Sequence, residues 1–192
     1  MTISSTYYQP LKDILDFVGA LALIILTFPL QLGIGLILFV KNRRVLFIHR
    51  RPGLHSNLFP LIKFRTMNDS EVIGFFESFL RKTSLDELPQ LYNIMIGQMS
   101  FIGPRPLLEE YLGAYSSEQL KRHSVKPGIT GWAQVNGRNQ LNLDEKVDYD
   151  LEYVNSISLR MDLKILRLTF IQVLKWGEAD LHAVQHKKAQ HA

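Results

Sequence analysis

The densest group of reactive side chains lies in the segment Arg81 to Gln90, which reads RKTSLDELPQ. Asp86 and Glu87 are adjacent carboxylates, and they follow the cations Arg81 and Lys82. A carboxylate beside cations and in the first turn of a helix should have a low pKa and stay ionised. Its oxygen atoms can then coordinate Mg²⁺ or attack an electrophilic phosphorus atom. Because the chain contains no Cys, thiol chemistry and Cys-ligated metals are excluded.

A structural interpretation of the same segment stays open. Ser84 is followed three residues later by Glu87, which is the spacing of a capping box, whose polar side chains merely begin a helix. Pro89 limits how regular that first turn can be, and this weakens a purely structural account. The spacing therefore permits both a helix cap and a carboxylate pair directed at phosphate.

Three other features offer charged or hydrogen-bonding groups. The sequence GPRP at 103–106 holds Arg105 in a stiff segment, which suits its guanidinium to a phosphate oxygen or simply to a rigid turn. The segment 126–138 reads KPGITGWAQVNGR and ends in Arg138. Its glycines allow close backbone approach and its polar side chains could hold a nucleotide, although it matches no Walker or GxGxxG motif. Asp162 lies at the start of a basic helix, where an Asp commonly just favours the N-terminus.

A long apolar segment would place these groups at a membrane. Residues Phe17 to Val40 include no charged side chain, and a helix rising about 1.5 Å per residue would extend roughly 36 Å, more than a hydrocarbon core of roughly 30 Å. Acidic residues precede the segment and a basic cluster at 41–44 follows it, unlike a signal peptide. Pro29 predicts a bend. The segment either spans the membrane or bends and re-enters; the alternative is a buried core helix of a soluble protein.

The rest of the chain predicts a mostly α fold with a small β-hairpin. Its 192 residues are 46% hydrophobic and 21% charged, which fits one folded domain. The last helix alternates apolar and basic residues, so it lies in the membrane interface or packs as an ordinary amphipathic helix. We expect a hairpin of 45–50 with 59–66, helices over 71–82, 85–96, 107–122, 143–155 and 159–176, and a structured loop over 126–139.

Taken together, these segments closely resemble the bacterial sugar transferase family, the small monotopic phosphoglycosyl transferases that load polyprenyl phosphate at the start of glycoconjugate assembly. The resemblance covers nearly the whole chain in the family's order, and the short length is similar to the minimal form that uses bacillosamine-type substrates. The matching stretches are the apolar segment with Pro29 and residues 63–67, 83–90, 97–106, 126–138 and 162–165.

This resemblance implies a two-step exchange. Asp86 would attack the sugar-proximal phosphorus of a UDP-sugar and release UMP, and polyprenyl (undecaprenyl) phosphate would then take the phosphosugar from the enzyme. Glu87 would complete an Asp-Glu dyad, and Mg²⁺ would bind Asp86 and the phosphates. The roles of four further residues follow from the same resemblance: Arg81 and Arg105 near phosphate, Arg138 and Asp162 in shaping the site.

The resemblance also implies a location and partners. The N-terminal membrane-associated segment, 1–43, would be a reentrant helix broken at Pro29, although Phe28 stands where the family often has Ser. A compact catalytic domain, 44–180, with interfacial amphipathic helices would face the cytoplasm at the bacterial inner membrane, and 181–192 would form a flexible tail. Membrane lipid would be a partner, Leu- and Phe-rich surfaces could support a homodimer, and no nucleic acid is expected.

Two competing hypotheses belong to other classes of protein. A net charge of +4 suits phosphate ligands, nucleic acid or an anionic membrane. A membrane-anchored scaffold that recruits nucleic acid or anionic lipid would not need Asp86, but no nucleic-acid motif is present. A metal-dependent hydrolase would use water in place of polyprenyl phosphate. No local motif encodes the sugar, and only the length resemblance favours an N-acetylated amino sugar.

Overall fold

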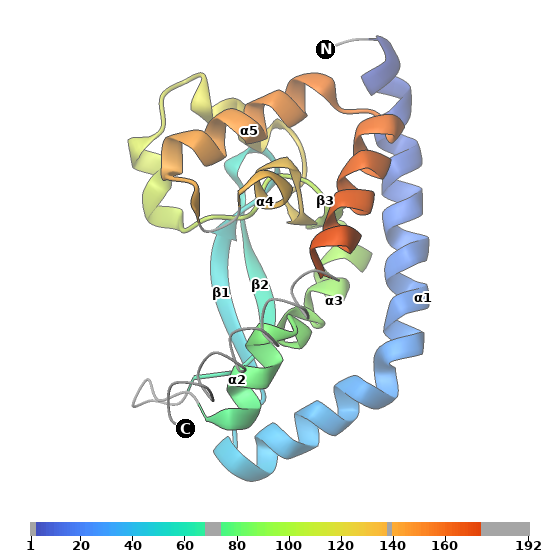
Figure 1. Ribbon diagram of the computed structural model, residues 1–192, viewed down its shortest axis with the longest axis vertical. Coiled ribbons are helices and arrows are strands. Elements are labelled where there is room, and N and C mark those ends of the chain that lie inside the picture. Colours follow the sequence, from blue (N-terminus) through green and yellow to red (C-terminus); the bar gives the residue numbers. More distant parts are fainter. Residues whose placement is uncertain (1–2, 68–73, 138–139, 174–192) are drawn as a thin grey trace, which may run out of the picture.

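The computed structural model of the chain describes residues 3–67, 74–137 and 140–173. The fold is mostly helical with two small sheets, as predicted, and one long helix runs along its side (Figure 1). The predicted flexible tail, 181–192, lies outside the described residues. So do the last residues of the predicted helix 159–176. The elements are α1 Ile3–Asn42, β1 Leu46–Pro52, β2 Leu58–Phe64, α2 Phe75–Lys82, α3 Gln90–Met95, β3 Ser100–Ile102, β4 Gly128–Thr130, α4 Trp132–Asn136, α5 Leu143–Ser156 and a helix over 159–173.

Helix α1 runs continuously for 40 residues and contains Pro29. Its axis changes direction in its second half, the half that contains Pro29 (Figure 1). A proline removes one backbone donor and crowds the carbonyl four residues earlier, here that of Ile25. The Thr27 hydroxyl does not donate to the Ile25 carbonyl. It donates instead to the Leu23 carbonyl at 2.6 Å and accepts from the Gln31 amide at 2.9 Å. These side-chain bonds run along the helix beside the proline.

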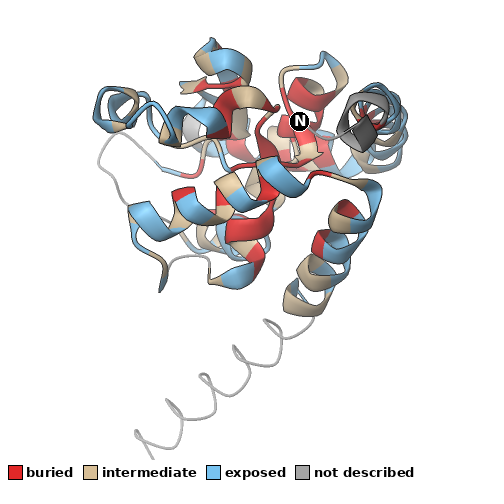
Figure 2. Cartoon of the chain, turned by 90° about the horizontal axis from the view of Figure 1, so that it is seen from above, coloured by how far each residue is buried: buried red, intermediate tan, exposed pale blue. Residues whose placement is uncertain are grey.

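One narrow face of α1 is buried against the rest of the chain. Its buried residues recur about once per helical turn, as a single packed stripe requires, and the remaining surface is largely exposed (Figure 2). Residues Tyr8–Lys41 are long and apolar enough to cross a membrane, and they contain an 18-residue stretch whose mean hydropathy is 2.4. Most apolar side chains of α1 are therefore not explained as the core of a soluble protein. The buried stripe is Tyr8, Lys12, Asp16, Ala20, Ile24, Gln31, Ile34 and Leu38.

Two strand pairs support the rest of the fold. The predicted hairpin is confirmed: β1 and β2 are antiparallel, with a register that runs from Leu46 opposite Phe64 to Pro52 opposite Leu58. A second pair was not predicted, because β3 and β4 have only three residues each and so carry no alternating pattern. They pair in parallel, and a Cβ on Gly128 would collide with the backbone of Gly103. The close backbone approach predicted for the glycine-rich segment is thus an approach of two strands.

The helix predictions had mixed outcomes. Helix α5 lies where it was expected, and Asn142 and Glu145 form a capping box at its start with bonds of 2.9 and 2.8 Å. The predicted helix 107–122 is wrong: this segment forms two 3-10 turns, Glu109–Ala114 and Gln119–Ser124. Gly113 and the serines at 116–117 interrupt its apolar periodicity, and such residues favour turns over helix interiors. The predicted structured loop 126–139 contains β4 and the short α4.

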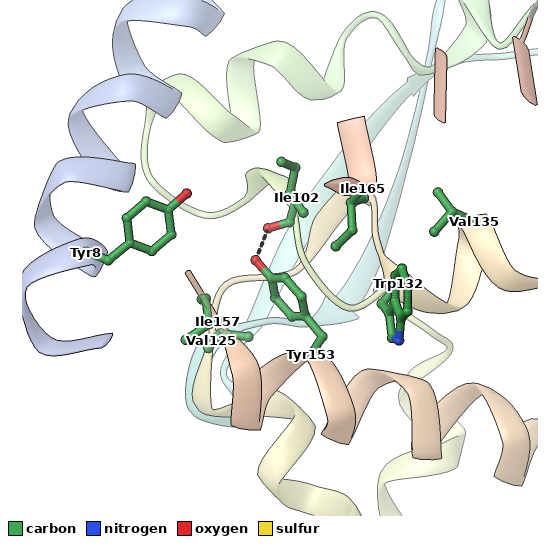
Figure 3. Close-up of a cluster of buried hydrophobic side chains, with 8 residues drawn as sticks. All are labelled: Tyr8, Ile102, Val125, Trp132, Val135, Tyr153, Ile157 and Ile165. Atoms are coloured by element: carbon green, nitrogen blue, oxygen red, sulfur yellow. Dashed lines mark hydrogen bonds between the residues drawn. The ribbon is translucent and has the colours of Figure 1, made fainter. Parts of the chain in front are cut away.

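The core joins the two halves of the chain. Buried residues Ala20 and Ile24 of α1 pack with Phe59 and Leu61 of β2 and with Leu91 and Ile94 of α3. A second cluster connects α1 to α4, α5 and the helix over 159–173 (Figure 3). Figure 3 shows the Tyr153 hydroxyl donating to the Ile102 carbonyl, at 3.2 Å, in the middle of this cluster. The hairpin, α3 and the strand pair are therefore held against one face of α1.

Candidate active site

The carboxylate pair lies in a single 3-10 turn, Leu85–Glu87, between α2 and α3. Ser84 before it has a left-handed backbone with φ of 56° and makes no capping hydrogen bond through its side chain. An N-cap residue normally has an extended backbone, from which its oxygen reaches the first free N–H groups. The capping-box interpretation of Ser84 and Glu87 is therefore wrong, and the Glu87 side chain is free to bind elsewhere.

Glu87 binds two cations that come from distant segments. Its Oε1 atom accepts from the Lys63 Nζ of β2 at 2.7 Å and from the Arg105 guanidinium at 3.0 Å. Burial by itself would raise the pKa of Glu87, but the charges of Arg105 and Lys63 outweigh it and hold the pKa below its usual range. Glu87 is therefore an ionised carboxylate that draws β2 and the 103–106 loop together.

Asp86 has the opposite electrostatic environment. Burial raises the pKa of its carboxyl, and the negative charge of Glu87 raises it further. Lys63 and Arg81 oppose this rise without cancelling it. The low pKa expected for Asp86 from the sequence is thus wrong, because the cations that lower a pKa are engaged mainly by its neighbour. Within the part of the chain that the structure describes, no cationic side chain forms an ion pair with Asp86.

A buried side chain sets the position of the dyad relative to Lys63. Asn93 of α3 is fully buried; its amide donates to the Pro60 carbonyl at 2.8 Å, and its oxygen accepts from the Ile62 backbone N–H at 3.1 Å. Both partners belong to β2, the strand that carries Lys63. This contact could not be predicted from the sequence, because an Asn inside a short apolar helix has no spacing that identifies its partner.

A second buried pair holds Arg105. The Arg122 guanidinium donates to the Arg105 carbonyl at 2.8 Å and to the Asp150 carboxylate at 2.6 Å. Arg122 and Asp150 are 1% and 2% exposed, so their mutual bond is shielded from water. Neither residue was singled out from the sequence, because they are far apart in the chain and each belongs to an ordinary polar face. Their pair fixes the backbone from which Arg105 reaches Glu87.

A cleft opens beside Lys63 and Arg105. Its volume is about 240 Å³, which is small for a ligand site but sufficient for part of a nucleotide. Its walls come from both hairpin strands, α3, the 103–106 loop and the turn Glu109–Ala114. The lining residues are Arg51, Leu61, Lys63, Gln90, Arg105, Pro106, Leu107, Leu108, Tyr111 and Gly128.

The other residues selected from the sequence lie in three different situations. Arg81 is exposed at the end of α2 and its charge reaches Asp86. Asp162 is buried away from the dyad: it accepts from the Tyr8 hydroxyl at 2.7 Å, from Lys12 Nζ at 2.6 Å and from the Tyr153 hydroxyl at 2.8 Å. Arg138 lies outside the described residues.

The site offers limited ligands for a metal ion. Among the described residues there is no group of three or more His, Asp or Glu side chains that could hold one. Mg²⁺, however, commonly binds only one or two carboxylates and takes its remaining ligands from water and from substrate phosphates. Asp86 fits this mode, since its carboxylate is not paired with a cation and the charge of Glu87 beside it would favour a bound cation.

The fold and the site together define a class of protein: an enzyme with a carboxylate pair and several cations beside a cleft, carried by a long apolar helix. Comparison with known proteins agrees with this class. The family model described as bacterial sugar transferase matches residues 7–176. The chain therefore belongs to the bacterial sugar transferase family, and it is an enzyme of the phosphoglycosyl transferase type, as the sequence predicted.

Individual relatives support the same conclusion. The "Uncharacterized sugar transferase EpsL" of Bacillus subtilis is 43% identical over 176 residues, which cover 85% of this chain and 87% of that protein. The "UDP-glucose:undecaprenyl-phosphate glucose-1-phosphate transferase" of Xanthomonas campestris is 36% identical, over 88% of this chain but 40% of its own length. The "Undecaprenyl-phosphate galactose phosphotransferase" of Salmonella typhimurium is 34% identical, over 86% and 40%. The chain thus spans about two fifths of the length of the two relatives whose names state a substrate.

Proposed function

We propose that this enzyme transfers a sugar-1-phosphate from a UDP-sugar to undecaprenyl phosphate and releases UMP, through a covalent intermediate on Asp86. The observation that carries the proposal is the difference between the surroundings of the two carboxylates of the dyad. Glu87 holds two cations, whereas Asp86 has a raised pKa and no ion pair in the described part of the chain. A carboxylate that is not neutralised by a neighbouring cation is the better nucleophile of the two.

The proposed first step is balanced within the donor and the enzyme. An ionised Asp86 oxygen forms a bond to the sugar-proximal phosphorus, and the bond from that phosphorus to the bridging oxygen breaks. The electron pair goes to the bridging oxygen, which becomes a terminal oxygen of UMP. In the second step an oxygen of undecaprenyl phosphate attacks the same phosphorus and returns the electron pair to Asp86. Arg105 and Arg81 would neutralise phosphate charge, since both lie near the dyad.

We further propose that Mg²⁺ is the metal cofactor. Asp86 would supply a protein ligand, and the donor phosphates would supply others. The ion would neutralise the negative charge of the diphosphate, which otherwise repels an anionic nucleophile. Lys63, bound to Glu87 at 2.7 Å, supplies positive charge at the same place from the protein side.

The acceptor is a lipid, so we propose that the enzyme works at the cytoplasmic face of the bacterial inner membrane. Support comes from the exposed apolar surface of α1 and from the bend in its second half (Figure 1), which suits a reentrant helix with both ends cytoplasmic. A cysteine introduced before residue 10 of this Cys-free chain should resist a membrane-impermeant thiol reagent in intact cells. Labelling of that cysteine would contradict the reentrant topology and support a span.

The reaction is tested by measuring UMP release from a panel of UDP-sugars with Mg²⁺ and undecaprenyl phosphate. We expect one or a few sugars to support release that depends on the lipid and is lost in Asp86→Asn. Asp148→Asn is a matched control, because Asp148 is an exposed acid on α5 and carries the same change of charge. Release without lipid dependence would indicate a hydrolase, and undiminished release by Asp86→Asn would overturn the proposed nucleophile.

A further inference from the structure

The cleft carries a third cation that the dyad does not explain. Arg51, near the end of β1, lines the same cavity as Lys63 and Arg105. Lys63 and Arg105 share the carboxylate of Glu87, but Arg51 takes no part in that cluster. The neighbouring Arg50 is exposed, because successive side chains of a strand point to opposite faces.

The hairpin register shows how Arg51 and Lys63 reach one cavity. Arg51 is opposite Phe59, and Lys63 is opposite Phe47. Directly opposite residues of an antiparallel pair share a face, as do residues two and four apart on one strand. Arg51 and Lys63 therefore lie on the same face of the hairpin, separated by about 14 Å along the strands at about 3.4 Å per residue. Both residues line the cleft.

The surroundings of Arg51 are suited to an anion. Its Nε atom is buried and has no hydrogen-bond partner among the described residues. Burial lowers the pKa of the Arg51 guanidinium, and the charge of Arg105 lowers it further, while Glu110 acts in the opposite direction. A buried donor without a partner costs free energy that a bound acceptor would recover. Guanidinium groups bind phosphate in a planar, bidentate manner.

We propose that Arg51 binds the phosphate of the nucleoside monophosphate that leaves in the first step. This inference rests on the proposed function, in which the bond between the sugar-proximal phosphorus and the bridging oxygen breaks. The transferred phosphoryl group stays at Asp86, next to Lys63 and Arg105, and the new negative charge on the former bridging oxygen forms on the other phosphate. Arg51, which lines the same cleft but does not bind Glu87, is the cation that would neutralise that charge.

The test is direct binding of UMP to the purified protein, measured by calorimetry for the wild type, Arg51→Ala, Arg51→Lys and Arg50→Ala. We expect Arg51→Ala to weaken UMP binding by about 10-fold or more, as the loss of a hydrogen bond to a charged group implies. Arg51→Lys should retain part of the affinity, because it keeps the charge but not the bidentate fork. Arg50→Ala, the same change on the opposite face of the strand, should bind as the wild type does.

Uridine supplies the second arm of the experiment. It lacks the phosphate, so its affinity should be the same in all four proteins, and a melting curve of each shows whether it is folded. Unchanged UMP affinity in Arg51→Ala, or an equal loss for uridine and UMP, would overturn the inference. If transfer is observed but the affinity for UMP does not depend on Arg51, only this inference fails. If UMP binding depends on Arg51 but no sugar and no lipid supports transfer, the nucleotide site stands and the proposed function fails.

Discussion

Glu87 and Asp162 both accept from a lysine at short distance, 2.7 Å from Lys63 and 2.6 Å from Lys12, yet their surroundings differ. Asp162 is 3% exposed, and both of its oxygens are used, one by Tyr8 and Lys12 and the other by Tyr153. Glu87 uses one oxygen for two cations, beside a cleft and next to an unpaired carboxylate. Removing one partner of a buried, fully bonded ion pair destabilises a fold, whereas an ion pair left open beside a cavity can serve a substrate.

The largest effect should follow the loss of the unpaired carboxylate. We expect Asp86→Asn to lower kcat by about 10³-fold or more, as the loss of a nucleophile does, because an amide cannot form the phosphoryl bond. Its melting temperature should stay close to that of the wild type, since Asp86 forms no ion pair in the described part of the chain. Steady-state UMP release and a thermal melt measure the two quantities. A melting temperature of Asp86→Asn far below that of the wild type would instead indicate a structural role for Asp86.

Loss of the buried carboxylate Asp162 should instead lower stability more than activity. Asp162→Asn leaves the Lys12 charge in the core without its partner, and breaking a buried pair costs about 3–5 kcal/mol. We therefore expect a clear fall in the free energy of unfolding in denaturant titrations. Activity of the fraction that remains folded should change much less than in Asp86→Asn. A wild-type stability combined with lost activity would place Asp162 in substrate binding, as the family resemblance implied.

Arg105 should have an intermediate effect. Removing one preorganised donor to a developing charge costs about 10²-fold in rate, so we expect a loss of that size in kcat/KM for Arg105→Ala. Lys63 still binds Glu87 in this variant, and stability should therefore change little. Arg105→Lys should recover only part of the loss, because it keeps the charge without the fork. Full recovery by lysine would mean that charge alone matters at this position.

The smallest effect concerns the buried polar group next to Arg122. Burial, and then the charge of Arg122, lower the pKa of His123 to about 4, whereas an unfolded histidine titrates near about 6.5. Between these values the unfolded state binds more protons, so the free energy of unfolding should fall as the pH falls. Denaturant titrations across this window should show a weaker pH dependence for His123→Gln than for the wild type. Equal slopes would show that His123 titrates normally in the folded protein.

The sequence predicted those features that depend on local pattern. The hairpin, α5 and the long apolar helix each carry a periodicity or a run that needs no distant partner. The helix predicted over 107–122 is wrong because its apolar spacing is typical of a helix, whereas Gly113 and the paired serines favour the turns that the chain forms there. The contacts of these turns with β1 and α5 add to that local preference.

The site was predictable only in part. The carboxylate pair stood out by adjacency, but its electrostatics depends on Lys63 and Arg105, which are distant in sequence. For the same reason the predicted low pKa of Asp86 is wrong, and the structure gives a raised pKa. The supports of the site, Asn93 and the pair of Arg122 with Asp150, are likewise long-range contacts. A single sequence does not show which distant residues lie close together in the folded chain. Such partners are therefore identified only from the structure.

The most direct test of the account is the mass of the protein after incubation with the active UDP-sugar and Mg²⁺ in the absence of undecaprenyl phosphate. We predict a gain equal to one phosphosugar, mapped to Asp86 by peptide analysis, with about one UMP released per enzyme and neither event in Asp86→Asn. Later addition of the lipid phosphate should remove the added mass. If no mass is gained, and no UMP appears until the lipid is present, both substrates react directly with each other and the covalent mechanism is wrong.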